Sequence, residues 1–211
     1  MNNNRSYFFL LVSFLFLNIV FGQTVLSVKE QQIFKTKVQE TANKITSIMS
    51  DFEQSKHLEM LSKPILSEGK LVFESPDKIL WQYTSPKAYQ VIFKDEMLYV
   101  DNDGKNDEIK LSSNKVFRSF NELIVNSIKG DMFDESMFDI SYFKISEGHL
   151  VKFFPKDKRM KRFISAFELT FTQNTGEVTK IKLVEPNNDY TLITFNNRKT
   201  NSKIPSETFT Q

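Results

Sequence analysis

The stretch "GKLVFESPDKILWQYTSP", residues Gly69–Pro86, decides the predicted fold. Apolar and polar residues alternate on both sides of the turn formers Ser75-Pro76-Asp77, with Leu71 and Phe73 before the turn and Ile79, Trp81 and Tyr83 after it. A period of two predicts short strands with one apolar face, and a tight turn between them requires antiparallel pairing. We therefore predict a β-hairpin that presents an apolar face, either to an ordinary closed core or to a cavity.

The same alternation extends along the chain on both sides of this hairpin. Turn-forming residues separate the runs, and short connections again favour antiparallel neighbours. The apolar positions of the further runs are Val91/Phe93, Leu98/Val100, Phe138/Ile140/Tyr142, Val151/Phe153, Phe167/Leu169/Phe171, Ile181/Leu183 and Ile193/Phe195.

Two stretches have helical periodicity instead. Ser27 and Glu30 have the spacing of a capping box, which marks a helix start. Apolar residues follow at intervals of three and four at Phe34, Val38, Ala42, Ile45, Ile48/Met49 and Phe52. A second stripe, stopped by Gly130, contains Val116, Phe117, Phe120, Leu123, Ile124 and Ile128. The pattern predicts a mainly β (α+β) fold, in which helices cover the concave side of a large, strongly curved antiparallel sheet of about ten or eleven strands.

The N-terminus predicts export. An apolar run from Tyr7 to Phe21, interrupted by Ser13 and Asn18, follows Arg5 and precedes Gly22-Gln23. Because this run is shorter than the roughly 20 residues of a spanning helix, we interpret residues 1–22 as a signal peptide cleaved near Gly22 rather than as a membrane anchor. Residues 23–211 then form a single domain, expected in the periplasm.

Few residues suit catalysis. The chain has no cysteine and only two histidines, His57 and His149, and neither lies in a nucleophile or metal-ligand motif. The run Asp101-Asn102-Asp103-Gly104 is explained by turn chemistry. We predict no enzyme activity, no catalytic residue, no metal and no cofactor, and the net charge of +2 gives no reason to expect nucleic acid. A secreted hydrolase is therefore disfavoured.

Two features suggest contacts with lipid. The chain has 21 phenylalanines, and a sheet of ten or more strands encloses more space than one layer of side chains fills, so either helices or a ligand must occupy it. A core packed completely by the helices is the alternative. The second feature is the basic cluster around Lys158, Arg159, Lys161 and Arg162, which is either a solvated turn or a docking patch for a membrane surface or an acidic partner.

The order of motifs over nearly the whole mature chain resembles the outer-membrane lipoprotein carriers, the LolA family. The matching segments are Phe52-Glu53-Gln54, Gly69-Lys70-Leu71, Pro76, Leu80-Trp81-Gln82-Tyr83, Pro86, Ile92-Phe93, Leu98-Tyr99-Val100, residues 149–155, Gly176-Glu177-Val178, residues 189–195 and residues 201–209.

The resemblance implies an unclosed antiparallel barrel with a helical lid. It also implies a monomeric carrier that receives acylated lipoproteins from an inner-membrane transporter and delivers them to an outer-membrane acceptor. From strand alternation we expect acyl chains against Leu71, Phe73, Trp81, Tyr83, Phe93, Phe167, Leu169 and Phe171. Phe117, Phe120, Leu123 and Ile124 would belong to the lid.

One position departs from the family pattern. Where well-known members have an arginine that hydrogen-bonds to the lid, this chain has Ser75, which cannot supply a charged fork. Ser75 therefore marks the position where control of the lid differs. A carrier of a free lipid, glycolipid or polyene lipid, and an envelope-sensing adaptor of the same fold, are the alternative functions.

Overall fold

A computed structural model describes residues 22–102, 104–111, 125–126 and 130–210. One long helix, α1, covers Val28–Ala42, and 3₁₀ helices cover Met160–Arg162 and Ser206–Phe209. The strands are β1 (Thr24–Val25), β2 (Ser47–His57), β3 (Ile65–Glu74), β4 (Lys78–Ser85), β5 (Tyr89–Lys94), β6 (Met97–Asn102), β7 (Lys105–Lys110), β8 (Phe138–Ile145), β9 (Gly148–Pro155), β10 (Ala166–Thr172), β11 (Val178–Val184) and β12 (Tyr190–Thr200).

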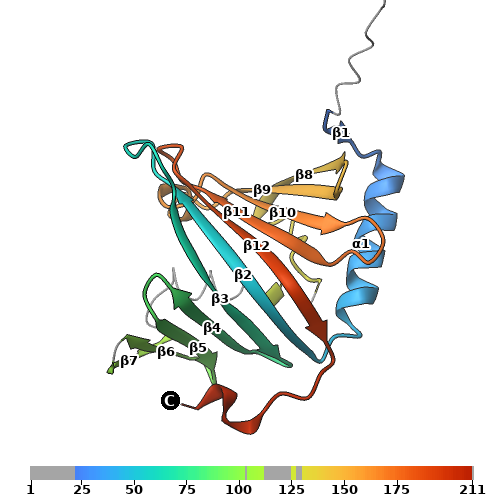
Figure 1. The fold of residues 1–211 in the computed structure, drawn as a ribbon. Helices are drawn as coiled ribbons and strands as arrows, with labels where there is room; N and C mark the ends of the chain where they lie inside the picture. The colour runs from blue at the N-terminus through green and yellow to red at the C-terminus, as the bar shows by residue number, and fades with distance from the viewer. Residues whose placement is uncertain (1–21, 103, 112–124, 127–129, 211) are drawn as a thin grey trace, which may run out of the picture.

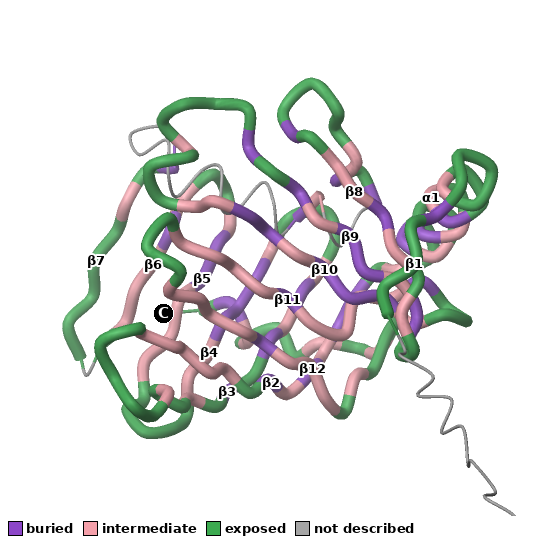
Figure 2. The backbone as a smooth tube through the Cα atoms, turned by 90° about the horizontal axis from the view of Figure 1, so that it is seen from above, coloured by how far each residue is buried: buried purple, intermediate pink, exposed green. Residues whose placement is uncertain are grey.

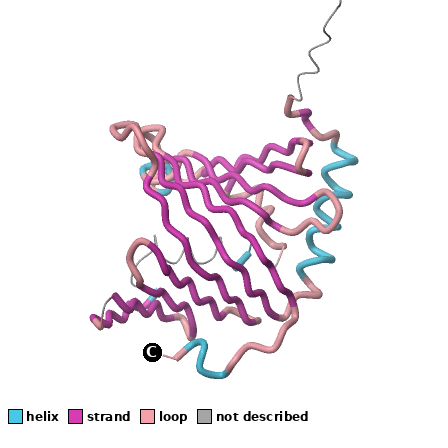
Figure 3. Tube along the Cα trace, viewed as in Figure 1, coloured by secondary structure: helices cyan, strands magenta, loops and turns pink. Residues whose placement is uncertain are grey.

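All twelve strands form one antiparallel sheet in the order β1-β8-β9-β10-β11-β12-β2-β3-β4-β5-β6-β7. The sheet curves strongly but does not close, because β1 and β7 are its two edges (Figures 1 and 3). The predicted fold class is confirmed, although the sheet has more strands than expected. β1 has only two residues, and β7 is an exposed, highly charged edge strand, so neither has an apolar alternation to recognise.

The predicted capping box starts α1. The Ser27 backbone N–H donates to Glu30 Oε2 at 2.8 Å, and the Glu30 N–H donates to Ser27 Oγ at 3.4 Å. The extension of this helix to Phe52 is wrong. α1 ends at Ala42, and Phe52 belongs to β2, whose backbone pairs with β3 on one side and β12 on the other.

The Gly69–Pro86 stretch forms the predicted hairpin of β3 and β4. Leu71 pairs with Trp81 and Phe73 with Ile79, so their side chains share the concave face. Gly69 permits close packing here, because a Cβ at this position would lie 2.0 Å from the carbonyl oxygen of Gln82.

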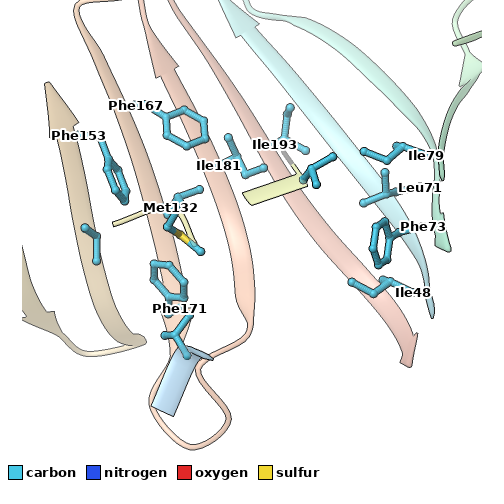
Figure 4. Close-up of a cluster of buried hydrophobic side chains, with 14 of the residues drawn as sticks. Ile48, Leu71, Phe73, Ile79, Met132, Phe153, Phe167, Phe171, Ile181 and Ile193 are labelled. Carbon is cyan, nitrogen blue, oxygen red and sulfur yellow. The ribbon is translucent and has the colours of Figure 1, made fainter. Parts of the chain in front are cut away.

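The main core fills the concave face of the sheet (Figures 2 and 4). It receives the predicted alternating residues from β3 to β6 and from β8 to β12, together with α1. A second, smaller cluster of Leu80, Ile92 and Phe209 lies on the opposite face, where the C-terminal segment covers β4 and β5. The terminus is held by Lys94 Nζ, which donates to the carbonyl oxygen of Phe209 at 2.9 Å.

The second predicted helix falls largely outside the described residues. Val125 and Asn126 are helical and Val125 is buried, whereas Phe117, Phe120, Leu123 and Ile124 lie outside the described part. Within the described ranges, no helix is both long and apolar enough to cross a membrane.

Candidate functional site

The apolar residues predicted to contact cargo come together on the concave face. Seven of them are buried in one continuous cluster, and Tyr83 is half-buried against it. Figure 4 shows Leu71 and Phe73 on one side of the cluster and Phe167 and Phe171 on another. Strands distant in sequence thus supply one apolar lining; its members are Leu71, Phe73, Trp81, Phe93, Phe167, Leu169 and Phe171.

Helix α1 covers one part of this lining. Phe34, Val38 and Ala42 form its buried stripe. The Phe34 ring lies 5.1 Å from the Phe171 ring and 4.7 Å from the His149 ring, measured between centroids. The buried stripe therefore fastens α1 to β9 and β10 through aromatic contacts.

Residues 130–133 complete the cover beside α1. A Cβ at Gly130 would lie 3.0 Å from Gln39 Cα and 3.1 Å from Ala42 Cβ, so this segment approaches the helix backbone closely. Met132 is buried in the main core, and the Phe133 ring lies 5.9 Å from that of Phe34. We call α1 and residues 130–133 together the cover.

In the described part of the chain, the polar contacts of α1 with the β10–β11 turn and with the segment before β8 lie at the surface. Thr41 Oγ1 donates to the carbonyl oxygen of Thr175 at 2.6 Å, in the turn between β10 and β11. Lys35 Nζ lies 2.8 Å from Glu135 Oε1, and the Glu135 side chain is 69 % exposed. Such exposed contacts contribute little each, so apolar packing provides most of the attachment of α1.

A cavity of about 50 Å³ lies between the C-terminal half of α1 and the sheet. Its lining is mostly apolar and includes Val38, Ala42, Leu71, Trp81 and Ile181. A cavity of about 150 Å³ binds one benzene molecule, and this cavity is about a third of that volume, so it is too small for an acyl chain. Among the described residues, α1 therefore lies against the lining with no room for an acyl chain in this cavity.

Arg198, on β12, forms a polar end of the cavity that the sequence did not reveal. Its Nε lies 3.6 Å from Glu177 Oε1, and its Nη1 donates to the carbonyl oxygen of Val178 at 3.3 Å. Burial lowers the pKa of the Arg198 guanidinium, while the charge of Glu177 opposes this shift. The ion pair fixes the start of β11 beneath α1.

His149 is a second titratable group under α1. Burial is the main cause that lowers its pKa, Lys144 and Lys37 lower it further, and Glu30 opposes them. Its Nδ1 is buried without a hydrogen-bond partner in the described part of the chain. The neutral ring therefore suits the closed cover better than the charged one.

Ser75 lies at the exposed turn between β3 and β4. Its backbone N–H donates to the carbonyl oxygen of Thr46 at 2.9 Å, in the loop that joins α1 to β2. The position predicted to control the lid is thus near the end of α1. However, the hydrogen bonds from α1 to the β10–β11 turn and to Glu135 come from Thr41, Lys37 and Lys35.

The predicted docking patch is separate from the cavity. Lys158, Arg159, Lys161 and Arg162 are exposed in the loop between β9 and β10, at the opposite end of the strands from the β10–β11 turn that holds α1. In the described ranges, no group of three or more histidine, acidic or cysteine side chains is arranged to hold a metal ion.

Comparison with known sequences decides the family. The family described as "Outer membrane lipoprotein carrier protein LolA" matches residues 43–211, which include eleven of the twelve strands. The chain belongs to the LolA family. The match starts after α1, so the LolA assignment rests on the sheet and its connections. No curated protein matches the chain.

Solved structures share the LolA-like fold at low identity. An uncharacterized conserved protein from Thermus thermophilus aligns with a TM-score of 0.53 at 7 % identity, over 86 % of this chain and 93 % of that one. A DUF1329 family protein from Desulfovibrio piger aligns with a TM-score of 0.52 at 13 % identity, over 86 % and 96 %. MucB aligns with a TM-score of 0.51 at 12 % identity, over 87 % of this chain and 63 % of its own.

Proposed function

We propose that this protein is a periplasmic, non-enzymatic carrier that shields the acyl chains of lipoproteins and delivers them to the outer membrane. It would receive its cargo from an inner-membrane transporter and pass it to an outer-membrane acceptor. The observation that carries the proposal is the apolar concave face of an unclosed sheet, closed over by α1 through packing and a few surface contacts. Membership of the LolA family supports it.

Loading requires the cover to move, because the cavity beneath α1 is far smaller than an acyl chain. The acyl chain would replace Phe34, Val38 and Ala42 on the lining. Burying Phe34 and Val38 contributes about 1.5–3 kcal/mol each, and Ala42 contributes less. An acyl chain with about 14 buried methylenes contributes about 11 kcal/mol, at roughly 0.8 kcal/mol per methylene. Relative to an acyl chain in water, replacing Phe34, Val38 and Ala42 on the lining by the acyl chain is therefore favourable.

Delivery then depends on an acceptor that binds the acyl chain more strongly than this protein does. The buried residues of α1 would assist release, because they return to the lining as the cargo leaves. The carrier thus needs no covalent chemistry, since loading and release are exchanges of apolar contacts.

Native mass spectrometry of the protein isolated from its host envelope tests the proposal. We expect bound mass that corresponds to an acylated protein or lipopeptide, and its loss in Phe167→Glu, which places a charge on the buried lining. Phe154→Glu is the matched control, because Phe154 is 40 % exposed on the neighbouring strand. Circular dichroism of each variant confirms that it is folded.

Three other results would contradict the proposal in different ways. Bound mass of a free lipid, glycolipid or polyene lipid would assign a different cargo. An empty protein that copurifies with a membrane protein would instead indicate an adaptor. Cargo retained by folded Phe167→Glu would show that the concave lining does not bind it.

A further inference from the structure

Three hairpin turns lie together at one end of the sheet. They connect β2 to β3, β9 to β10 and β11 to β12, and the antiparallel strand order places all three on the same rim. Figure 1 shows these loops together at the rim away from α1. Neighbouring strands are about 4.8 Å apart, so the outer two loops are separated by about 20 Å or less along the sheet. We call this edge the loop rim.

The loop rim exposes large apolar side chains. Met60 is 86 % exposed, Leu66 is 64 % exposed and Phe163 is 55 % exposed, and Leu61 and Ile65 are exposed beside the first two. These residues lie in protruding loops and at the adjoining start of β3, and do not line a pocket. Apolar side chains that project from the surface can insert into the fluid acyl region of a bilayer, which does not need a complementary shape.

Basic side chains lie in the same loops as these apolar residues, most of them beside Phe163 in the β9–β10 loop. Lys158, Arg159, Lys161 and Arg162 are exposed, and none of them forms an ion pair with another residue in the described ranges. Lys63 adds a further exposed cation in the β2–β3 loop.

The β9–β10 loop holds its basic residues in a defined arrangement. Asp157 Oδ1 accepts from the backbone N–H groups of Arg159 at 2.8 Å and Met160 at 2.9 Å. Met160 packs inward against the main core, which leaves Phe163 outside. The loop is thus anchored from within and presents cations and one aromatic ring to solvent.

Two acidic residues of the β11–β12 turn, Asp189 and Glu185, contact the end of β2 and the β2–β3 loop, whereas Glu59 is an exposed acidic residue of the β2–β3 loop. Asp189 Oδ1 accepts from the backbone N–H of Glu59 at 2.7 Å, and Glu185 lies 3.7 Å from Lys56. These contacts join the β11–β12 turn to the end of β2 and the β2–β3 loop. The strongest positive charge therefore lies in the β9–β10 loop, where Asp157 is the one acidic residue among the basic ones.

We propose that the loop rim docks on a bilayer surface that contains anionic lipid. The basic residues attract the headgroups, and the apolar tips enter the boundary between headgroups and acyl chains. The protruding shape of the apolar tips favours a lipid surface over an acidic protein partner. This inference concerns membrane contact and holds whether or not the cavity carries lipoproteins. Because α1 is attached at the opposite rim, docking leaves the cover free to open.

Vesicle flotation tests the docking surface. The chain from residue 23 onward is suitable, because α1 and all twelve strands start after Gln23. We expect flotation with vesicles of phosphatidylcholine containing phosphatidylglycerol at low salt, and little flotation with phosphatidylcholine alone or at high salt. A basic residue near an anionic surface contributes about five-fold to binding, so the quadruple variant Lys158→Gln/Arg159→Gln/Lys161→Gln/Arg162→Gln should bind at least about fifty-fold more weakly.

Matched variants distinguish the effect of the loop rim on flotation from the effects of net charge and of cargo binding. Lys29→Gln/Lys44→Gln/Lys144→Gln/Lys203→Gln removes the same charge at exposed positions away from the loop rim and should float much better than the first quadruple variant. Met60→Ser/Phe163→Ser should bind more weakly at equal charge. Phe167→Glu should still float, which makes failure of the carrier proposal distinguishable from failure of this one. Equal flotation of the two quadruple variants, no effect of Met60→Ser/Phe163→Ser, or no flotation with anionic vesicles would each overturn the inference.

Discussion

Replacing Phe34 with alanine tests how strongly the buried stripe of α1 closes the lining. Phe34 is 3 % exposed, and its ring contacts the rings of His149 and Phe171. In a rigid core, Phe→Ala costs about 3–5 kcal/mol. We expect α1 to separate while the sheet remains folded, because the other buried residues of the helix are only Val38 and Ala42. We therefore expect the free energy of global unfolding to fall by about 2 kcal/mol, less than the full cost.

Because the open state already lacks the Phe34 contacts, the substitution also lowers the free energy of opening the cover, and the free energy of unfolding stops falling once the open form is the main folded state. A shift of at least about 1.4 kcal/mol toward the open state raises the open population at least tenfold. Stopped-flow measurements with a fluorescent fatty acid, read through the single tryptophan Trp81, should show uptake at least tenfold faster in Phe34→Ala. Ile33→Ala is the control, because Ile33 is on the same helix but 60 % exposed. Unchanged uptake together with a full loss of 3–5 kcal/mol would show that α1 is a fixed part of the core, and would refute the reasoning.

Three further changes test other parts of the structure. Gly69→Ala should lower the unfolding midpoint in urea sharply or prevent folding, because its Cβ would collide with the Gln82 carbonyl, and normal stability would contradict the packing described for the hairpin. The pKa of His149 is lowered in the folded protein, so the free energy of unfolding should decrease as the pH falls below the ordinary histidine pKa of about 6.5, and should continue to decrease toward the lowered pKa. In His149→Gln, the urea midpoint should change less between pH 7.5 and 5.5. The same pH profile in the variant and the unchanged protein would exclude this role. Thr41→Val should remove the hydrogen bond to Thr175, cost about 1 kcal/mol or less, and increase hydrogen exchange at the end of α1 without affecting β2; protection equal to that of the unchanged protein would show that this contact does not hold the helix.

The concave lining could be predicted because its signal is local. Alternate residues of a strand face the same side, so the apolar positions around Leu71, Trp81 and Phe167 indicated one face before the strand order was known. The curvature of the sheet then brings these faces together. For the same reason, the prediction of a hairpin from Gly69 to Pro86 was correct for both strands and for the turn.

The parts that were wrong or missed depend on residues distant in sequence. Ile48 and Phe52 fit a helical spacing, but pairing with β3 and β12 places them in β2. The Arg198–Glu177 pair and the hydrogen bond from Thr41 exist only because the sheet brings β11, β12 and α1 together. Helical spacing alone could not indicate where α1 gives way to a strand.

The basic cluster was noticed in the sequence, but its apolar neighbours were not. The exposed residues of the β2–β3 loop are more than ninety positions away from it and join the same rim only through the strand order. Met60 and Leu66 are apolar, so their residue types alone do not indicate that they are exposed. Their exposure in the folded protein is what gives the cluster a second, apolar component.

The central claim is that cargo enters between α1 and the concave lining, and a reversible crosslink tests it most directly. A Cβ at position 176 would lie 3.5 Å from Val38 Cα and 3.3 Å from Val38 Cγ2, a spacing compatible with a disulfide between Val38→Cys and Gly176→Cys in a chain that has no other cysteine. Gly176 has a φ of +70°, so the Gly176→Cys single variant measures the strain that the substitution itself causes. Binding of a triacylated lipopeptide is then measured before and after reduction, with each single-cysteine variant as the control. We predict that the oxidised protein does not bind the lipopeptide and that reduction restores binding. Equal binding by the oxidised and reduced forms would contradict the account.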